Sequence, residues 1–138
     1  MQHVSEGLIA VLKEQIHCAE AMLETLGREN RALTSGDAEE LNAAGADKAR
    51  LVEALESLER QRRSLTAAVA AAAPPEWRRL LDLIGQCKVR NERNGALVKA
   101  RSEQVRGALR ALRGTQPDLY GRSGIAPATA DGRSLGSA

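Results

Sequence analysis

Three long rows of apolar residues, spaced three and four apart, most strongly constrain the fold of this chain. The rows run over residues 9–33, 41–69 and 77–112. This spacing places the apolar side chains of each row on one face of a helix. Aromatic residues make up only 1% of the chain, so its core must come from Leu, Ala, Val and Ile. Because such residues suit helix–helix seams better than sheets, the sequence predicts an all-α fold.

Signals for helix ends divide the rows into three helices, over about residues 4–34, 37–73 and 75–113. Gly36 can adopt a positive φ, and Asp37 can cap the next helix, with Glu40 completing a capping box. Pro75 suits the first turn of the third helix, and Gly114 suits its end. We therefore expect an elongated antiparallel three-helix bundle, coiled-coil-like, over residues 1–114. The tail, residues 115–138, is rich in Gly, Ser and Ala and is predicted to be flexible, with a short docking motif.

Charge is distributed unevenly along the chain. Residues 1–73 hold 8 Lys/Arg and 12 Asp/Glu, a net charge of −4, whereas residues 74–114 hold 10 and 4, a net charge of +6. One interpretation is that a basic third helix packs against two acidic ones. The other is a nucleic-acid surface. We favour packing and expect no nucleic-acid partner, because no aromatic residues for base stacking are interleaved with the basic ones.

Motifs for catalysis and for metal binding are absent from the sequence. There is no Gly-rich phosphate loop, no Gly-x-Ser-x-Gly and no Cys/His spacing that suits zinc, so we expect no enzyme activity, cofactor or metal. Cys18 and Cys87 are expected to be reduced thiols, although a disulfide between them stays open. No apolar run approaches the roughly 18 residues of a membrane span, and no signal-peptide pattern is present at the N-terminus.

A polar interruption divides the third apolar row: Trp77, Leu80, Ile84, Val98, Val105, Leu109 and Leu112. In the interruption, Asn91 continues the seven-residue spacing from Ile84 to Val98, and Asn94 and Gly95 follow it. A seam Asn can fix register, and Gly can let a neighbouring helix approach closely. The alternative is a contact surface for a foreign helix, because a fourth amphipathic helix is the natural missing layer of a three-helix bundle. The candidate binding residues are Asn91, Asn94, Gly95, Val98, Val105, Leu109 and Leu112.

An apolar pair, Leu119 and Tyr120, lies in the otherwise small and polar tail. A tyrosine ring with its hydroxyl suits an anchor in a shallow pocket of a partner. Alternatively, the pair could fold back and cover the end of the bundle.

These residues resemble the FlgN family of flagellar export chaperones, from the first helix to Gly124. The resemblance rests on Lys48-x-x-Leu51 with Leu55 and Leu58, Arg62 and Arg63, Trp77, Asn91-x-x-Asn94-Gly95, and Leu119-Tyr120-Gly121-x-x-Gly124. The Asn-x-x-Asn-Gly and Leu-Tyr-Gly-x-x-Gly pieces are its most specific parts.

The resemblance implies a cytoplasmic, non-enzymatic chaperone of flagellum assembly. Proteins of this family bind the C-terminal helical regions of the hook–filament junction proteins FlgK and FlgL and keep them unassembled. They bring these cargoes to the type III export gate, where the cytoplasmic domain of FlhA is the docking partner. The family's tail tyrosine matches Tyr120, and its cargo-binding region matches the second half of the third helix. The alternatives are a structural or adaptor coiled coil without an export role, and self-association of the third helix into a homo-oligomer.

Overall fold

The computed structural model describes residues 2–67 and 73–115, which form three helices. These are α1 (Gln2–Ser35), α2 (Ala38–Ala67) and α3 (Pro75–Thr115). No strand occurs in those two ranges. The predicted all-α helical bundle is therefore confirmed.

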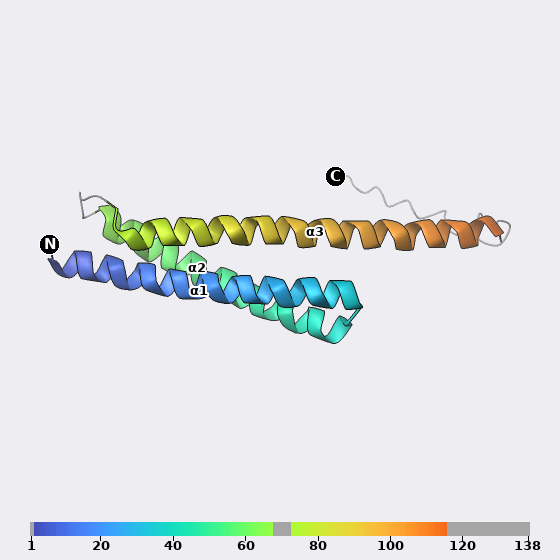
Figure 1. Cartoon of the computed structure of the whole chain (residues 1–138), viewed down its shortest axis with the longest axis horizontal. Helices are drawn as coiled ribbons and strands as arrows, with labels where there is room; N and C mark the ends of the chain where they lie inside the picture. Colours follow the sequence, from blue (N-terminus) through green and yellow to red (C-terminus); the bar gives the residue numbers. More distant parts are fainter. Residues whose placement is uncertain (1, 68–72, 116–138) are drawn as a thin grey trace, which may run out of the picture. The chain divides into compact units, whose positions relative to one another are not determined.

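The chain divides into two compact units, Met1–Leu97 and Val98–Ala138. The first unit holds α1, α2 and the part of α3 that ends at Leu97. In Figure 1, α1 and α2 lie side by side and run antiparallel, joined by a tight connection. The second unit holds the rest of α3 and the tail. The boundary between the two units falls between residues 97 and 98, within the range predicted for the bundle.

The connection between α1 and α2 has the predicted geometry at Gly36 and Asp37. Gly36 has a φ of 77°, and the backbone amides of Gly36 and Asp37 both donate to the carbonyl of Ala32, at 2.9 and 3.0 Å. The Asp37 carboxylate accepts a hydrogen bond from the backbone amide of Glu40 at 3.1 Å, which caps α2. The Glu40 carboxylate does not return this contact, because it accepts hydrogen bonds from Arg28 at 2.9 and 3.2 Å. The predicted capping box is therefore only half formed.

The start of α3 also follows the sequence. Pro75 is its first residue, and the backbone amide of Trp77 donates to the carbonyl of Pro74 at 3.0 Å. The predicted second helix extended to Ala73, but Ala73 lies outside any helix. Residues 68–72 lie outside the described part of the chain.

Side chains from α1 and α3 form most of the core of the first unit. One cluster holds Leu8, Leu12 and Ala19 of α1 with Leu80 and Leu83 of α3. A second cluster lies further along α1 and holds Met22, Leu26 and Cys87, with Leu51 and Leu55 of α2 packed against it. The absence of Phe is consistent with these small aliphatic seams.

The buried face of α3 agrees only in part with the one that the heptad spacing predicted. Leu80 of the predicted row is buried, together with Leu83, Cys87 and Asn94, whereas Ile84 and Asn91 of that row are exposed. Leu80, Cys87 and Asn94 lie seven residues apart, as do Ile84, Asn91 and Val98, so the seven-residue period alone cannot choose between the two stripes. The stripe that faces the bundle includes an Asn whose amide finds partners on α1.

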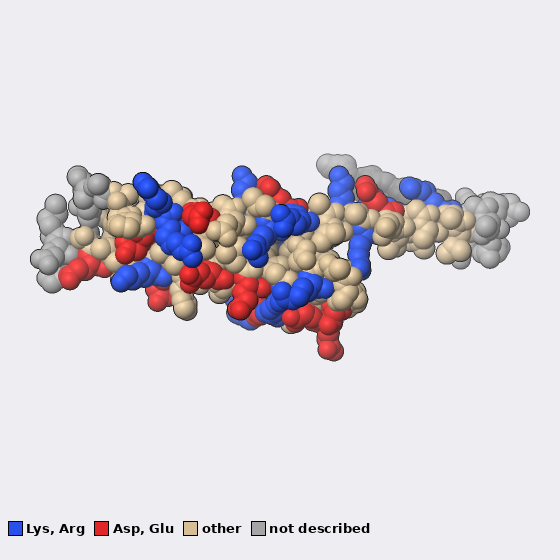
Figure 2. Space-filling view, in the orientation of Figure 1, with Lys and Arg blue, Asp and Glu red and all other residues tan. Residues whose placement is uncertain are grey.

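Ion pairs join all three helices of the first unit. Arg28 of α1 pairs with Asp47 of α2 at 2.6 Å, and Arg79 of α3 pairs with Glu20 of α1 at 3.5 Å. On the face seen in Figure 2, basic and acidic side chains are interleaved along this unit. This arrangement agrees with the interpretation that the basic third helix packs against acidic neighbours.

Candidate functional site

Asn94 lies at the centre of a polar network inside the first unit. Its side chain is 3% exposed, and its amide nitrogen donates to the backbone carbonyl of Leu26 and to the carboxylate of Glu29, both at 2.9 Å. Its amide oxygen accepts a hydrogen bond from Asn30 at 3.1 Å. Burial of an amide is tolerated only when its hydrogen bonds are made, as they are here.

Lys48 of α2 connects this network to the surface. Its amine lies 2.6 Å from the side-chain oxygen of Asn91 and 3.4 Å from both carboxylate oxygens of Glu29. Glu29 therefore receives hydrogen bonds from Lys48 and from Asn94. We call Glu29, Asn30, Lys48, Asn91 and Asn94 the polar network; it links α1, α2 and α3 through side chains.

Asn91, Asn94 and Gly95, the three residues of the polar interruption, lie in different environments. Asn94 was predicted to belong to a contact surface, but its burial makes it part of the packing between α1 and α3. Asn91 is exposed, although Lys48 holds its side-chain oxygen. Gly95 is exposed as well, and a Cβ added there would meet nothing within 4 Å. The close helix approach that Gly95 could have allowed is therefore not made here.

The second unit carries a row of exposed apolar side chains on its part of α3. Val98 is 48% exposed, Val105 59%, Leu109 46% and Leu112 64%. Their spacings of seven, four and three place them along one stripe of the helix. We call these four residues the exposed row. An apolar stripe of this length left accessible on a helix is typical of an interaction surface.

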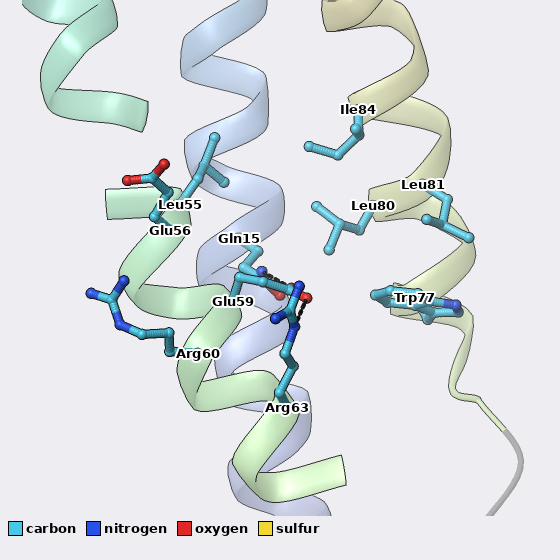
Figure 3. Close-up of a pocket in the computed structure, with 10 residues that line it drawn as sticks. All are labelled: Gln15, Leu55, Glu56, Glu59, Arg60, Arg63, Trp77, Leu80, Leu81 and Ile84. Atoms are coloured by element: carbon cyan, nitrogen blue, oxygen red, sulfur yellow. Dashed lines mark hydrogen bonds and ion pairs between the residues drawn. The ribbon is translucent and has the colours of Figure 1, made fainter. Parts of the chain in front are cut away.

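A groove in the first unit lies between α2 and α3. Figure 3 shows Trp77, Leu80 and Ile84 of α3 along one wall, with Gln15 of α1 and Glu59 of α2 opposite. Its volume is about 610 Å³, and it is completed by Leu55, Glu56, Arg60, Arg63 and Leu81.

The carboxylate of Glu59 is the electrostatic centre of this groove. Arg62 donates to it at 2.7 and 2.8 Å, Arg63 at 3.0 Å and Gln15 at 3.3 Å. Hydrogen bonds, the strongest from Arg62, lower the pKa of Glu59 from its ordinary 4.5 to about 2. A carboxylate held ionised by arginines is a structural ion-pair centre and a poor general acid.

Arg62 has a second role beside the groove. Its guanidinium carbon lies 4.4 Å from the centre of the Trp77 ring, a cation–π contact between α2 and α3. Arg62 and Lys48 are basic residues within the apolar row of α2, and each makes a specific contact with α3. Their location on a seam was the signal that could have revealed these partners.

Other sequence predictions concern the cysteines, possible metal sites, possible membrane spans and the Leu119–Tyr120 pair. Cys18 and Cys87 are free thiols, and Cys87 is buried with its sulfur 3.5 Å from the carbonyl of Ala19. Burial raises the pKa of both thiols. Within residues 2–67 and 73–115, no group of acidic, His and Cys side chains could hold a metal ion. In the same ranges, no helix is long and apolar enough to span a membrane. Leu119 and Tyr120 lie outside the described residues.

The comparison with protein families decides the identity of the chain. The model of the family described as FlgN protein matches residues 1–128. This chain belongs to the FlgN family. The match covers all three helices and extends past Tyr120, so the resemblance seen in the sequence is confirmed. No curated protein and no solved structure matches the chain significantly.

Membership of the FlgN family supports a general role as a flagellar export chaperone. FlgN proteins act as chaperones and are not known as enzymes, which agrees with a surface made of an apolar stripe and structural ion pairs. The polar network contains both Asn91 and Asn94, so the Asn-x-x-Asn-Gly piece of the resemblance lies where the three helices meet.

Proposed function

We propose that this FlgN-family protein is a cytoplasmic chaperone for the hook–filament junction proteins FlgK and FlgL. It binds their C-terminal helical regions, prevents premature assembly and delivers them to the cytoplasmic domain of FlhA at the export gate. The observation that carries the proposal is the exposed row on α3, in a chain of an export-chaperone family.

The exposed row supplies the cargo surface. A cargo segment that will later be packed inside a filament exposes an apolar face beforehand, and such a face promotes premature association. The exposed row can cover that face, with the cargo helix packed along α3. Fully burying a Val or Leu side chain is worth about 1.5–3 kcal/mol, and these four are already half covered. The row therefore favours a reversible complex, which release at the gate requires.

Residues of the polar interruption contribute to this surface in different ways. Asn91 and Gly95 are exposed just before the exposed row and can contact the near end of a cargo helix. Asn94 acts indirectly, because its hydrogen bonds to Leu26 and Glu29 hold α3 against α1. We assign Asn94 to positioning rather than to cargo contact.

We assign docking on the export gate to Leu119 and Tyr120. This assignment rests on the family match, which includes both residues, and on the chemistry of a tyrosine anchor. It separates the two tasks: cargo binding by α3 and gate binding by the tail.

Co-purification tests the proposal directly. The full chain and a version ending at residue 114 should both retain FlgK or FlgL from a lysate of flagellated cells. Only the full chain should retain the FlhA cytoplasmic domain. Failure of the full chain to retain either junction protein would instead favour a structural or adaptor coiled coil.

A further inference from the structure

We propose that the exposed row takes an acidic amphipathic helix, in which carboxylates flank the apolar seam. This inference rests on the proposed cargo role of the exposed row and adds the charge class of the cargo.

A row of cations lies beside the exposed row on the same part of α3. Each cation follows an apolar residue directly: Lys99 follows Val98, Arg106 follows Val105, and Arg113 follows Leu112. Because both rows repeat every seven residues, they run parallel along the helix. The side chains of Lys99, Arg106 and Arg113 are all exposed. The Arg106 side chain makes a long contact, 3.5 Å, with the carbonyl of Ser102 in its own helix.

Heptad positions show what these cations would meet in a complex. When Val98, Val105 and Leu112 occupy position d, Leu109 occupies position a, and the three cations all occupy position e. Side chains at e flank the seam and set the choice of partner through charge. Residues 98–113 hold five Lys/Arg and a single carboxylate, Glu103, at position b away from the seam.

This pattern disfavours a second copy of the chain as the occupant. In an antiparallel pair of α3 helices, the e row of one copy would face the e row of the other, and like charges would repel. In a parallel pair, the e row would face position g, occupied by Arg101 and Ala108, where no carboxylate is available. A partner helix with Asp or Glu beside its seam instead pairs with every cation of the row.

Synthetic helical peptides test the charge class with the full chain. Three peptides share one Leu/Val seam and differ only at the flanking positions, which are Glu, Gln or Lys. Calorimetric titration should give the tightest binding for the Glu peptide and the weakest for the Lys peptide. Binding of the Glu peptide should weaken as salt rises, because exposed ion pairs are screened. Equal binding of all three peptides would overturn the proposal.

Charge reversal on the protein provides the matched comparison. The variant K99E/R106E/R113E should bind the Glu peptide at least about tenfold more weakly, since three exposed ion pairs are lost. It should also prefer the Lys peptide. The control K13E/R78E/K88E makes the same change in net charge at exposed sites of the first unit and should bind like the parent. Equal weakening by both variants would show a mere effect of net charge and overturn the proposal.

Two further measurements test whether DNA or a second copy of the chain occupies the exposed row, and separate this proposal from the proposed chaperone function. Duplex DNA that bound more tightly than the Glu peptide, or concentration-dependent dimers abolished by K99E/R106E/R113E, would overturn the acidic-helix assignment. The last measurement is the binding of C-terminal segments of the junction proteins to the parent and to K99E/R106E/R113E. If these segments bind the parent and K99E/R106E/R113E equally, the charge proposal fails and the chaperone function stands. If the Glu peptide binds selectively and the segments do not bind, the charge proposal stands and the proposed chaperone function fails.

Discussion

The side-chain amide of Asn94 on α3 donates a 2.9 Å hydrogen bond to the backbone carbonyl of Leu26 on α1. The Asn94 amide lies in the interior of the first unit, where water cannot replace a lost hydrogen-bond partner. An isolated buried polar group costs about 1–3 kcal/mol, so this bond makes α3 sensitive to changes at Asn94.

Replacement of Asn94 by Ala should therefore lower the melting temperature. Loss of the amide leaves Glu29 and Asn30 without one of their partners, and we expect a fall of more than about 5 °C by circular dichroism. The matched control is Asn91→Ala, which removes an exposed amide from the same helix and should change stability by less than about 0.5 kcal/mol. Equal melting of the two variants would contradict the structural role of Asn94.

Two Gly→Ala substitutions should change stability in opposite directions. At Gly95 an added Cβ meets nothing within 4 Å, so Ala should stabilise the helix by about 0.5–1 kcal/mol. At Gly36 the φ of 77° strains any side chain, so Ala should destabilise by about 1 kcal/mol. Urea denaturation measures both. A loss of stability at Gly95 would mean that this position needs its glycine for a contact outside the structure described here.

Two charges placed in the exposed row should abolish cargo binding without unfolding the protein. In V105D/L109D, binding of a junction-protein C-terminal segment should fall by about 100-fold or more, because two apolar contacts are replaced by charges that would have to be desolvated. Helical content should stay close to the parent's, since both residues are exposed. The control V52D/V89D alters two exposed valines of the first unit and should bind normally. Loss of helix in V105D/L109D alone would identify these residues as core.

Replacement of Tyr120 by Ala should separate the two tasks of the chaperone. Binding to the FlhA cytoplasmic domain should fall by at least about tenfold, as for a typical anchor residue. Cargo affinity and melting temperature should remain unchanged. The conservative Tyr120→Phe tests whether the ring alone is sufficient. A lower melting temperature for Tyr120→Ala would support the alternative that the tail covers the end of the bundle.

Stability should depend on the ionisation of Glu59 at acid pH. Its pKa is lowered to about 2 in the folded protein, so the folded state holds its proton less readily than the unfolded state. Its contribution is present above about pH 5 and is lost as the pH falls towards 2. Because the Glu59 carboxylate is partly exposed, we expect it to contribute only about 1 kcal/mol to the free energy of unfolding. Urea denaturation at pH 7 and at pH 3 should show that the free energy of unfolding falls less on acidification for Glu59→Gln than for the parent.

Local signals in the sequence predicted the helices well, because they act through neighbouring residues. Gly36, Asp37 and Pro75 occupy the turn and cap positions that their backbone chemistry favours. The buried face of α3 was predicted only in part, since the exposed stripe of Ile84 and Asn91 has the same seven-residue period as the buried stripe of Leu80, Cys87 and Asn94. The choice between them depends on partners across the bundle, such as the Leu26 carbonyl for Asn94.

The role of the exposed row as the cargo surface stays a prediction. The exposed row could be read from spacing, but whether the row is buried depends on neighbours that spacing does not reveal. For Lys48 and Arg62, the spacing of residues in the sequence predicted no partners. Their contacts with Asn91 and Trp77 depend on the relative rotation of two helices, which no local pattern encodes.

Trp77 is the single tryptophan of the chain, and its ring lies under the Arg62 guanidinium. Intrinsic fluorescence therefore reports one event, the separation of α3 from α2 near Pro75. Circular dichroism reports all three helices together. If α3 detaches before α1 and α2 melt, the emission will change ahead of the ellipticity, and the unaltered protein will reveal its own order of opening.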